Sequence, residues 1–217
     1  MSLHDDEPAG PPARARRDRR QIAVLAAILL GCFALYAPSL QNGFTWDDRA
    51  AALGVFDGLE HPLVSRLRPL DDYLTENCWP HTAAASRSWR PLTTLTFALR
   101  YAAVGDDPFV EHLANVSLHA LAVLLCFAVA RALGAGFAAA AAGALVFGAH
   151  AVHSEVVCRV VGRNELLPLT AGLAATLALR KGLVGSSRAF AGWLAVAALL
   201  LAVACLTKES GLAWTAC

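Results

Sequence analysis

Residues 21–49 read QIAVLAAILLGCFALYAPSLQNGFTWDDR. No charged residue precedes Asp47 in this stretch, and the uncharged part is long enough to cross the hydrocarbon core of a bilayer as a helix. Asp47 and Asp48 follow together, where such a helix would meet the water interface. Two acids at this position are typical of the solvated start of a loop. Alternatively, one of the carboxylates could act as a base, because a group at the interface can contact both a lipid-borne and a water-borne reactant.

The composition is that of a polytopic membrane protein. The 217 residues are 57% hydrophobic and 16% charged, with a mean hydropathy of +0.50, which excludes an ordinary soluble domain. The formal net charge is +1, and apart from the N-terminal arginines no basic stretch is interleaved with aromatic residues, so we expect no nucleic-acid partner. No CxxC pair occurs, so neither a zinc site nor a dithiol redox motif is indicated. A bridge between Cys78 and Cys158 stays open.

The N-terminal residues predict the orientation. Residues 1–20 combine prolines with five arginines just before the first apolar run, so we expect a disordered tail that stays in the cytoplasm. Residues 22–40 are predicted to be an uncleaved signal anchor. Residues 41–111 contain three tryptophans and most of the acidic residues, and they are predicted to form a long first loop on the lumenal side.

Helical patterns continue beyond the first span. Residues 90–101 place apolar side chains at helical spacing, which predicts an amphipathic helix along the membrane face. The uncharged runs 112–130 and 132–154 predict a transmembrane hairpin. Asn115 opens an Asn-Val-Ser glycosylation sequon at the mouth of this hairpin, where we expect it to be inaccessible and unmodified.

Two more spans complete the predicted all-α, polytopic fold of about five transmembrane helices. Residues 166–179 are only 14 uncharged residues, about 21 Å of helix against a core of about 30 Å, so this helix should begin inside the polar residues before it. Residues 189–207 form the last span. Because an apolar run reopens at 211–214, we expect a truncated chain that continues into further spans.

This topology collects the polar residues that border the spans on one side. Such asymmetry indicates a site for an anionic, membrane-held substrate, in which carboxylates act as a base while cations neutralise a phosphate. Metal ligation by the two histidines and the acid of 150–155, and plain interfacial packing, stay open as alternatives. The members of this constellation are Asp47, Asp48, Arg90, His150, His153, Glu155, Arg163, Asn164, Glu165, Lys208 and Glu209.

Six strings of this chain, in order, resemble the membrane half of the transmembrane and tetratricopeptide-repeat O-mannosyltransferases, the TMTC family. They are NGFTWDD (42–48), SWRPLTTLTF (88–97), HLANVSLHA (112–120), HAVHSE (150–155), VGRNELL (161–167) and KESG (208–211). The resemblance implies that residues 21–217 are the N-terminal part of a type C glycosyltransferase fold, multi-pass in the membrane of the endoplasmic reticulum. Ala151 stands where the family pattern has a proline, and the chain shows no tetratricopeptide period.

The resemblance also implies a reaction. The donor would be dolichyl-phosphate mannose, a lipid-linked substrate, with no resident cofactor expected, and the acceptors would be Ser or Thr of secretory-pathway proteins such as cadherins. Asp47 or Asp48 becomes the catalytic carboxylate, and Arg163, Lys208 or Arg90 would neutralise the leaving phosphate. Which aspartate is the base stays open. A non-catalytic membrane adaptor or scaffold of the endoplasmic reticulum, or an anion transporter with a broken fourth helix, are the competing hypotheses.

Overall fold

The computed structural model describes residues 13–79 and 88–216, and within these the all-α prediction is confirmed. The strands of this part of the chain form one antiparallel hairpin, β1 (Val55–Phe56) and β2 (Leu59–Glu60). Residues 1–12 of the expected disordered tail lie outside the described residues. From residue 13 onward that tail is helical instead, because alanine and arginine favour helix and continue directly into the first apolar run.

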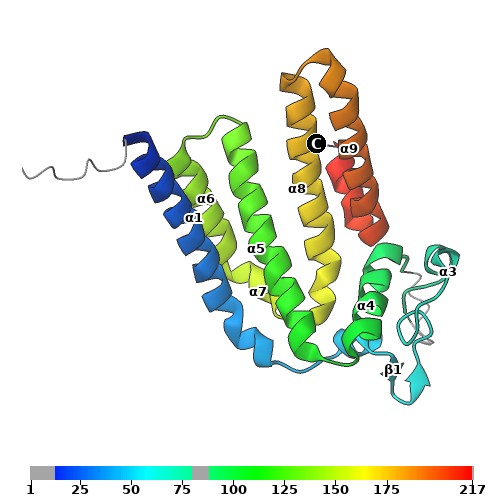
Figure 1. Cartoon of the computed structure of the whole chain (residues 1–217). Coiled ribbons are helices and arrows are strands. Elements are labelled where there is room, and N and C mark those ends of the chain that lie inside the picture. Colours follow the sequence, from blue (N-terminus) through cyan, green and yellow to red (C-terminus); the bar gives the residue numbers. More distant parts are fainter. Residues whose placement is uncertain (1–12, 80–87, 217) are drawn as a thin grey trace, which may run out of the picture.

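Within the described residues, four helices are long and apolar enough to cross a membrane, which supports a multi-pass membrane protein. Figure 1 shows them rising from one end of the molecule and fanning apart toward the other. They are α1 (Ala13–Tyr36), which continues into the 3-10 helix η1 (Ala37–Gln41), α5 (Pro108–Ala132), α8 (Arg163–Val184) and α9 (Ser187–Thr207).

The predicted third span is broken rather than continuous. The helix α6 (Phe137–Ala149) packs against α5 as the expected hairpin partner, but its 13 residues give only about 20 Å of helix. At His150 the backbone leaves the helical region, and the His150 Nδ1 atom accepts a hydrogen bond from the Val152 amide at 3.2 Å. The 3-10 helix η2 (Ala151–His153) and α7 (Ser154–Val157) then continue at 45° to α6.

The fourth span begins among polar residues, as predicted. A 3-10 turn, η3 (Val160–Gly162), leads into α8, whose first residues are Arg163, Asn164 and Glu165. Arg163 and Asn164 are both buried, so the polar start of this helix faces protein. Charged groups at membrane depth are costly unless they face protein or water, and the polar start of α8 meets this condition.

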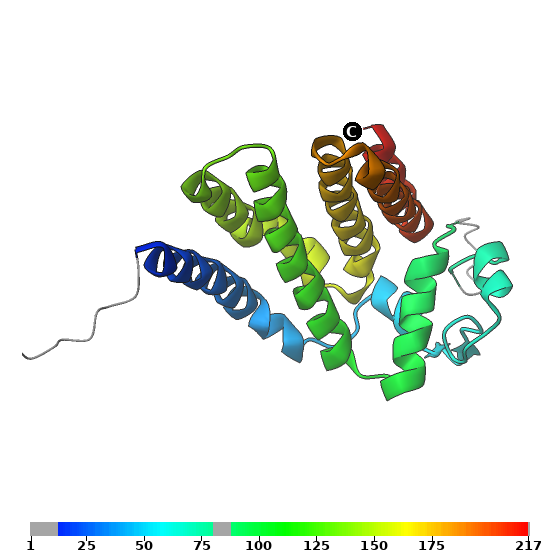
Figure 2. The same cartoon turned by 45° about the horizontal axis from the view of Figure 1, so that its top comes forward.

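The polar segments lie at one end of the bundle. In Figures 1 and 2 the α5–α6 and α8–α9 turns lie at the end opposite to α7, α2 (Asp47–Ala52) and β1. The start of α1 lies at the same end as those turns. Within the described residues, 41–79, 88–111, 150–165 and 208–211 therefore gather at one end, as the sequence predicted.

In the first loop, α3 (Leu70–Thr75) packs on α4 (Pro91–Val104), and α4 in turn packs against α9 and α8. The expected amphipathic helix is α4, but its buried face mixes polar with apolar residues, and part of its apolar surface is exposed. Thr93, Thr94 and Phe97 are buried, whereas Leu99 is 52% exposed. Because the Thr93 hydroxyl donates to the Thr207 carbonyl at 3.0 Å, the polar face of α4 joins it to the end of α9.

The 3-10 helix η4 (Glu209–Ala216) folds back along α9 and α8. A Cβ atom on Gly172 of α8 would lie 2.1 Å from the Trp214 ring, and one on Gly211 would lie 2.2 Å from the Ala204 carbonyl oxygen. The apolar run at 211–214 is thus packed closely against the spans. Glycine is needed at both positions for this approach.

Candidate active site

The polar end of the bundle holds a cavity of about 720 Å³. Its walls come from α2, the first loop, the segment that runs from α7 to the start of α8, and the residue that follows α9. Trp46, Phe56 and Trp79 supply aromatic surface. The charged lining residues are Asp47, Arg90, Glu155, Arg159, Glu165 and Lys208.

Ion pairs link the cations of the cavity to its acids. Arg159 Nη2 lies 3.5 Å from Asp47 Oδ2, and Arg159 Nη1 lies 3.5 Å from Glu155 Oε1. Lys208 pairs with Glu165. Since the lining holds three cations and three carboxylates, an entering anion finds a nearly neutral wall whose cations already have partners.

The aspartate doublet separates into two environments. The Asp47 side chain is 60% exposed and faces the cavity. Asp48 is 1% exposed, and its Oδ1 atom accepts the Val161 amide at 2.7 Å. Its Oδ2 atom accepts from the amide and hydroxyl of Thr45 at 3.2 and 3.0 Å. Asp48 therefore ties the start of α2 to the start of α8, while Asp47 remains available to a ligand.

Trp46 lies at the N-cap of α2 in an unusual backbone conformation. Its φ is 40° and its ψ is −115°, backbone angles that residues other than glycine rarely adopt. The turn is held by the Asp48 amide, which donates to the Thr45 carbonyl at 2.8 Å, together with the Thr45 bonds to Asp48. Trp46 is 90% exposed and lines the cavity, and backbone strain of this kind is frequent at functional sites.

A buried charge cluster fastens this region to the spans. Glu111 of α5 is fully buried and pairs with both Arg100 of α4 and Arg163 of α8. Arg100 also donates to the Ala52 carbonyl at the end of α2, at 2.8 Å. The Arg163 guanidinium carbon lies 4.7 Å from the centre of the Phe97 ring. These contacts join α2, α4, α5 and α8 behind the cavity.

Several curated proteins are similar to this chain over most of its length. Protein O-mannosyl-transferase Tmtc1 of Drosophila melanogaster is 36% identical over 97% of this chain and 24% of its own length. Protein O-mannosyl-transferase Tmtc2 of the same organism is 37% identical over 83% of this chain, and human TMTC3 is 32% identical over 89%. The chain belongs to the TMTC family.

The chain spans only between 19% and 24% of the length of these TMTC relatives. No family model and no solved structure matches it. The family is therefore established by whole-sequence identity to curated TMTC proteins. The geometry of the site comes from this chain alone.

The structure brings together part of the constellation expected from the sequence of this TMTC chain. Asn164 also lines the cavity beside its charged residues, and Glu209 lies at its edge, 3.7 Å from Arg90 Nε. Arg163 and Asp48 are buried outside the cavity lining, in the contacts described above. Their positive and negative charges are committed to protein partners.

The two histidines of the 150–155 string are also absent from that lining. His153 packs its ring against Phe147 at 4.5 Å and against His119 at 5.2 Å between centroids, so it belongs to an aromatic cluster with α5 and α6. His150 caps η2. Within the described ranges, no group of three His, Cys, Asp or Glu side chains lies close enough to hold a metal ion.

The Asn115 sequon is buried, and Cys78 and Cys158 are not bridged. Asn115 is fully buried, and its amide nitrogen donates to the carbonyls of Arg159 and Val160 at 2.6 and 3.2 Å. Its predicted inaccessibility is confirmed. Cys78 and Cys158 are both free thiols, so the bridge that the sequence left open is not formed.

Sequence reasoning did not select three residues that shape this site. Arg159 could have been found because it lies four residues after Glu155, a spacing that favours ion pairs on a helix. No pattern in the sequence predicts that Trp46 is exposed. The partners of Glu111 lie on α4 and α8, so its role depends on contacts between distant segments.

Proposed function

We propose that this chain forms the catalytic membrane part of a protein O-mannosyltransferase. The donor is dolichyl-phosphate mannose, and the acceptors are Ser or Thr hydroxyls of secretory-pathway proteins, including cadherin-like domains. The observation that carries this proposal is the exposed carboxylate of Asp47 in a cavity at the polar end of the spans, whose wall also carries Arg90, Arg159 and Lys208. The relatives' names, protein O-mannosyl-transferase, support the same reaction.

Asp47 acts as the general base. One of its carboxylate oxygens takes the proton of the acceptor hydroxyl, whose oxygen forms a bond to the anomeric carbon of mannose. The bond from that carbon to the phosphate oxygen breaks, and dolichyl phosphate leaves with the electron pair. Lys208 and Arg90 neutralise the charge that develops on the phosphate. A base positioned in this way accelerates transfer by about 100- to 10,000-fold.

The site has a proposed orientation. The polar end that holds Asp47 lies in the lumen of the endoplasmic reticulum, and the N-terminus lies in the cytoplasm. The arginines before the first span support this orientation through the positive-inside rule. The cavity then opens where a lipid phosphate and a secretory-pathway protein can meet.

The test is Asp47→Asn in the full-length protein, measured as mannose transfer to an acceptor protein. The amide keeps the size of the side chain but removes its basicity, so we expect a loss of about 100-fold or more at unchanged expression. The matched control is Asp71→Asn, an exposed acid of α3 outside the cavity lining, which should transfer normally.

Transfer at the parental rate by Asp47→Asn would remove the proposed base. A non-catalytic adaptor or scaffold of the same membrane would show no transfer by the parent protein itself. The two outcomes therefore separate an incorrect mechanism from an incorrect class of function.

A further inference from the structure

Arg159 bridges two acids at the wall of the cavity. Its two terminal nitrogens lie 3.5 Å from Asp47 Oδ2 and 3.5 Å from Glu155 Oε1. All three side chains are partly exposed, and ion pairs between exposed side chains are weak. A doubly hydrogen-bonded anion can therefore displace either acid from the guanidinium.

The other cations of the cavity are placed differently. Lys208 pairs with Glu165, and Arg90 is 16% exposed and lies near Glu209. Arg159 is the cation whose ion pair includes the candidate base. Its planar guanidinium also matches the geometry of a phosphate better than an ammonium group does.

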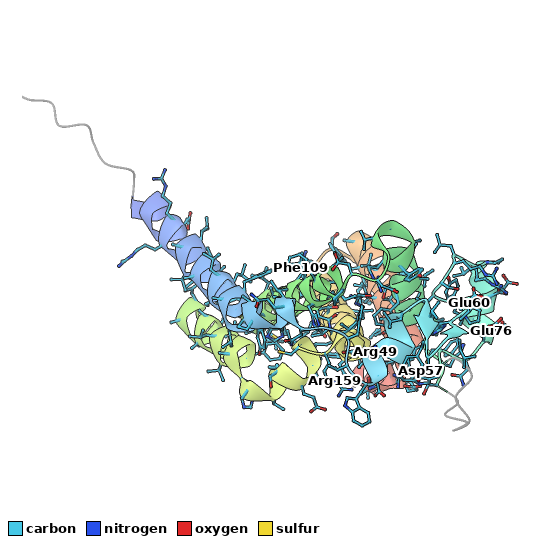
Figure 3. The ribbon with its side chains drawn as sticks, turned by 90° about the horizontal axis from the view of Figure 1, so that it is seen from below. Arg49, Asp57, Glu60, Glu76, Phe109 and Arg159 are labelled. Atoms are coloured by element: carbon cyan, nitrogen blue, oxygen red, sulfur yellow. The ribbon has the colours of Figure 1, made fainter. Side chains whose placement is uncertain are left out.

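The main chain at Arg159 is held independently of its side chain. The Arg159 carbonyl accepts the Asn115 amide at 2.6 Å, and two residues later the Val161 amide donates to Asp48. The side chain projects from this fixed backbone and is 39% exposed. Figure 3 looks onto this end of the molecule and shows Arg159 near the middle of the face, close to the α2 ribbon. It can thus change partners without moving the fold.

We propose that Arg159 is a switch between Asp47 and the phosphate of the donor. Arg159 pairs with Asp47 Oδ2, an oxygen that would accept the acceptor's proton. When the donor binds, Arg159 moves to the phosphate and frees Asp47. This inference rests on the proposed lipid-phosphate donor, and it couples donor binding to release of the base.

A double-mutant cycle on donor binding tests the switch without relying on transfer. The probe is dolichyl phosphate in detergent micelles, titrated against the full-length protein. Arg159→Gln should weaken binding by roughly 10-fold or more, as expected for loss of hydrogen bonds from a charged donor. Asp47→Asn should tighten binding by about two- to fivefold, because it releases Arg159 from a weak exposed pair.

The decisive comparison is Asp47→Asn in the Arg159→Gln background. Removing the Asp47 charge also reduces its repulsion of the phosphate, so some gain in binding is expected in both backgrounds. Competition for Arg159 makes the gain larger when Arg159 is present. The control is Glu165→Gln, which removes a carboxylate of the same cavity that pairs with Lys208, so its effect should be equal in the two backgrounds.

Equal gains from Asp47→Asn in both backgrounds, or undiminished binding by Arg159→Gln, would overturn the switch while leaving the proposed donor intact. Absence of dolichyl phosphate binding by the parent protein would overturn the proposed donor and the switch together. Unchanged thermal unfolding of each variant in detergent establishes that the measured effects arise in the cavity.

Discussion

Asp47 and Asp48 are adjacent in the chain but meet different surroundings. The Asp48 carboxylate accepts three hydrogen bonds in a buried position, whereas the Asp47 carboxylate is exposed in the cavity beside Arg159. Because α2 begins here, one turn of helix carries both the candidate base and the group that fixes its place. The chemistry of the site thus depends on a side chain that never reaches the cavity.

Asp48→Asn should destabilise the protein, while Asp47→Asn should not. Each carboxylate oxygen of Asp48 accepts from a backbone N–H, of Val161 or of Thr45, so an amide N–H in either position would face a donor and one of these hydrogen bonds would be lost in a buried place. We expect a loss of about 1–3 kcal/mol in the free energy of unfolding. Thermal unfolding in detergent and limited proteolysis of the first loop measure it. Equal stability of the two variants would contradict the separation of the doublet.

Cys78 provides a prediction about pH. Burial raises the pKa of the Cys78 thiol from 9.0 to about 11, opposed by the nearby Arg90 charge. The native thiol should therefore react with iodoacetamide with a midpoint near pH 11, against about pH 9 after unfolding. The unfolded thiol loses its proton first, so this group's contribution to stability is present below pH 9 and is lost between pH 9 and pH 11. A midpoint near pH 9 in the native protein would show that Cys78 is solvated.

At the scale of elements, the breaks between helices build the site. The α6 helix ends at Ala149, and the short elements η2, α7 and η3 then bring Arg159 and Val161 to the cavity before α8 begins. The turn at η3 depends on close approach of two backbones. A Cβ atom on Gly162 would lie 1.8 Å from the Val156 carbonyl oxygen.

Gly162→Ala should accordingly displace the α7–α8 junction and weaken both the Asp48 tether and the Arg159 pairs. We expect a loss of roughly 1–3 kcal/mol in stability, the usual cost of overpacking, together with reduced binding of dolichyl phosphate. Gly143→Ala in α6 is the matched control. Since no atom lies within 4 Å of its added Cβ, it should be neutral or slightly stabilising. Equal behaviour of the two variants would argue against a constrained junction.

At the scale of the whole molecule, the buried cluster around Glu111 holds the first loop on the spans. Glu111 pairs with Arg100 from α4 and with Arg163 from α8, and Arg100 in turn binds the end of α2. Burying two arginines is costly unless an acid and further hydrogen bonds accompany them. The loop and the membrane helices are therefore expected to unfold together.

Glu111→Gln should destabilise the fold by about 3–5 kcal/mol, because it leaves two buried guanidinium groups without their carboxylate. Thermal unfolding in detergent measures this loss. Limited proteolysis shows whether the first loop stays attached to the spans. Glu155→Gln serves as the control, since Glu155 is an exposed acid. A similar melting temperature for the parent and Glu111→Gln would show that the cluster does not secure the loop.

The sequence by itself determined the spans and their polar end. Uncharged runs of sufficient length must be helical in a membrane, because backbone groups have no other partners there. The short run at 166–179 likewise required a helix that starts among polar residues, and α8 begins at Arg163. These are local consequences of composition and length, so they could be predicted from one chain.

Only the tertiary structure decided which polar residues are paired inside the protein and which face the cavity. Asp48 meets its Val161 partner across 113 positions of sequence, and Arg163 meets Glu111 across 52, so no local pattern reveals that these charges are already satisfied. The same folding leaves Asp47 and Arg159 facing a cavity. A side chain's role follows from which groups are within hydrogen-bonding distance and how much water remains around it, and both are settled only when distant segments pack together.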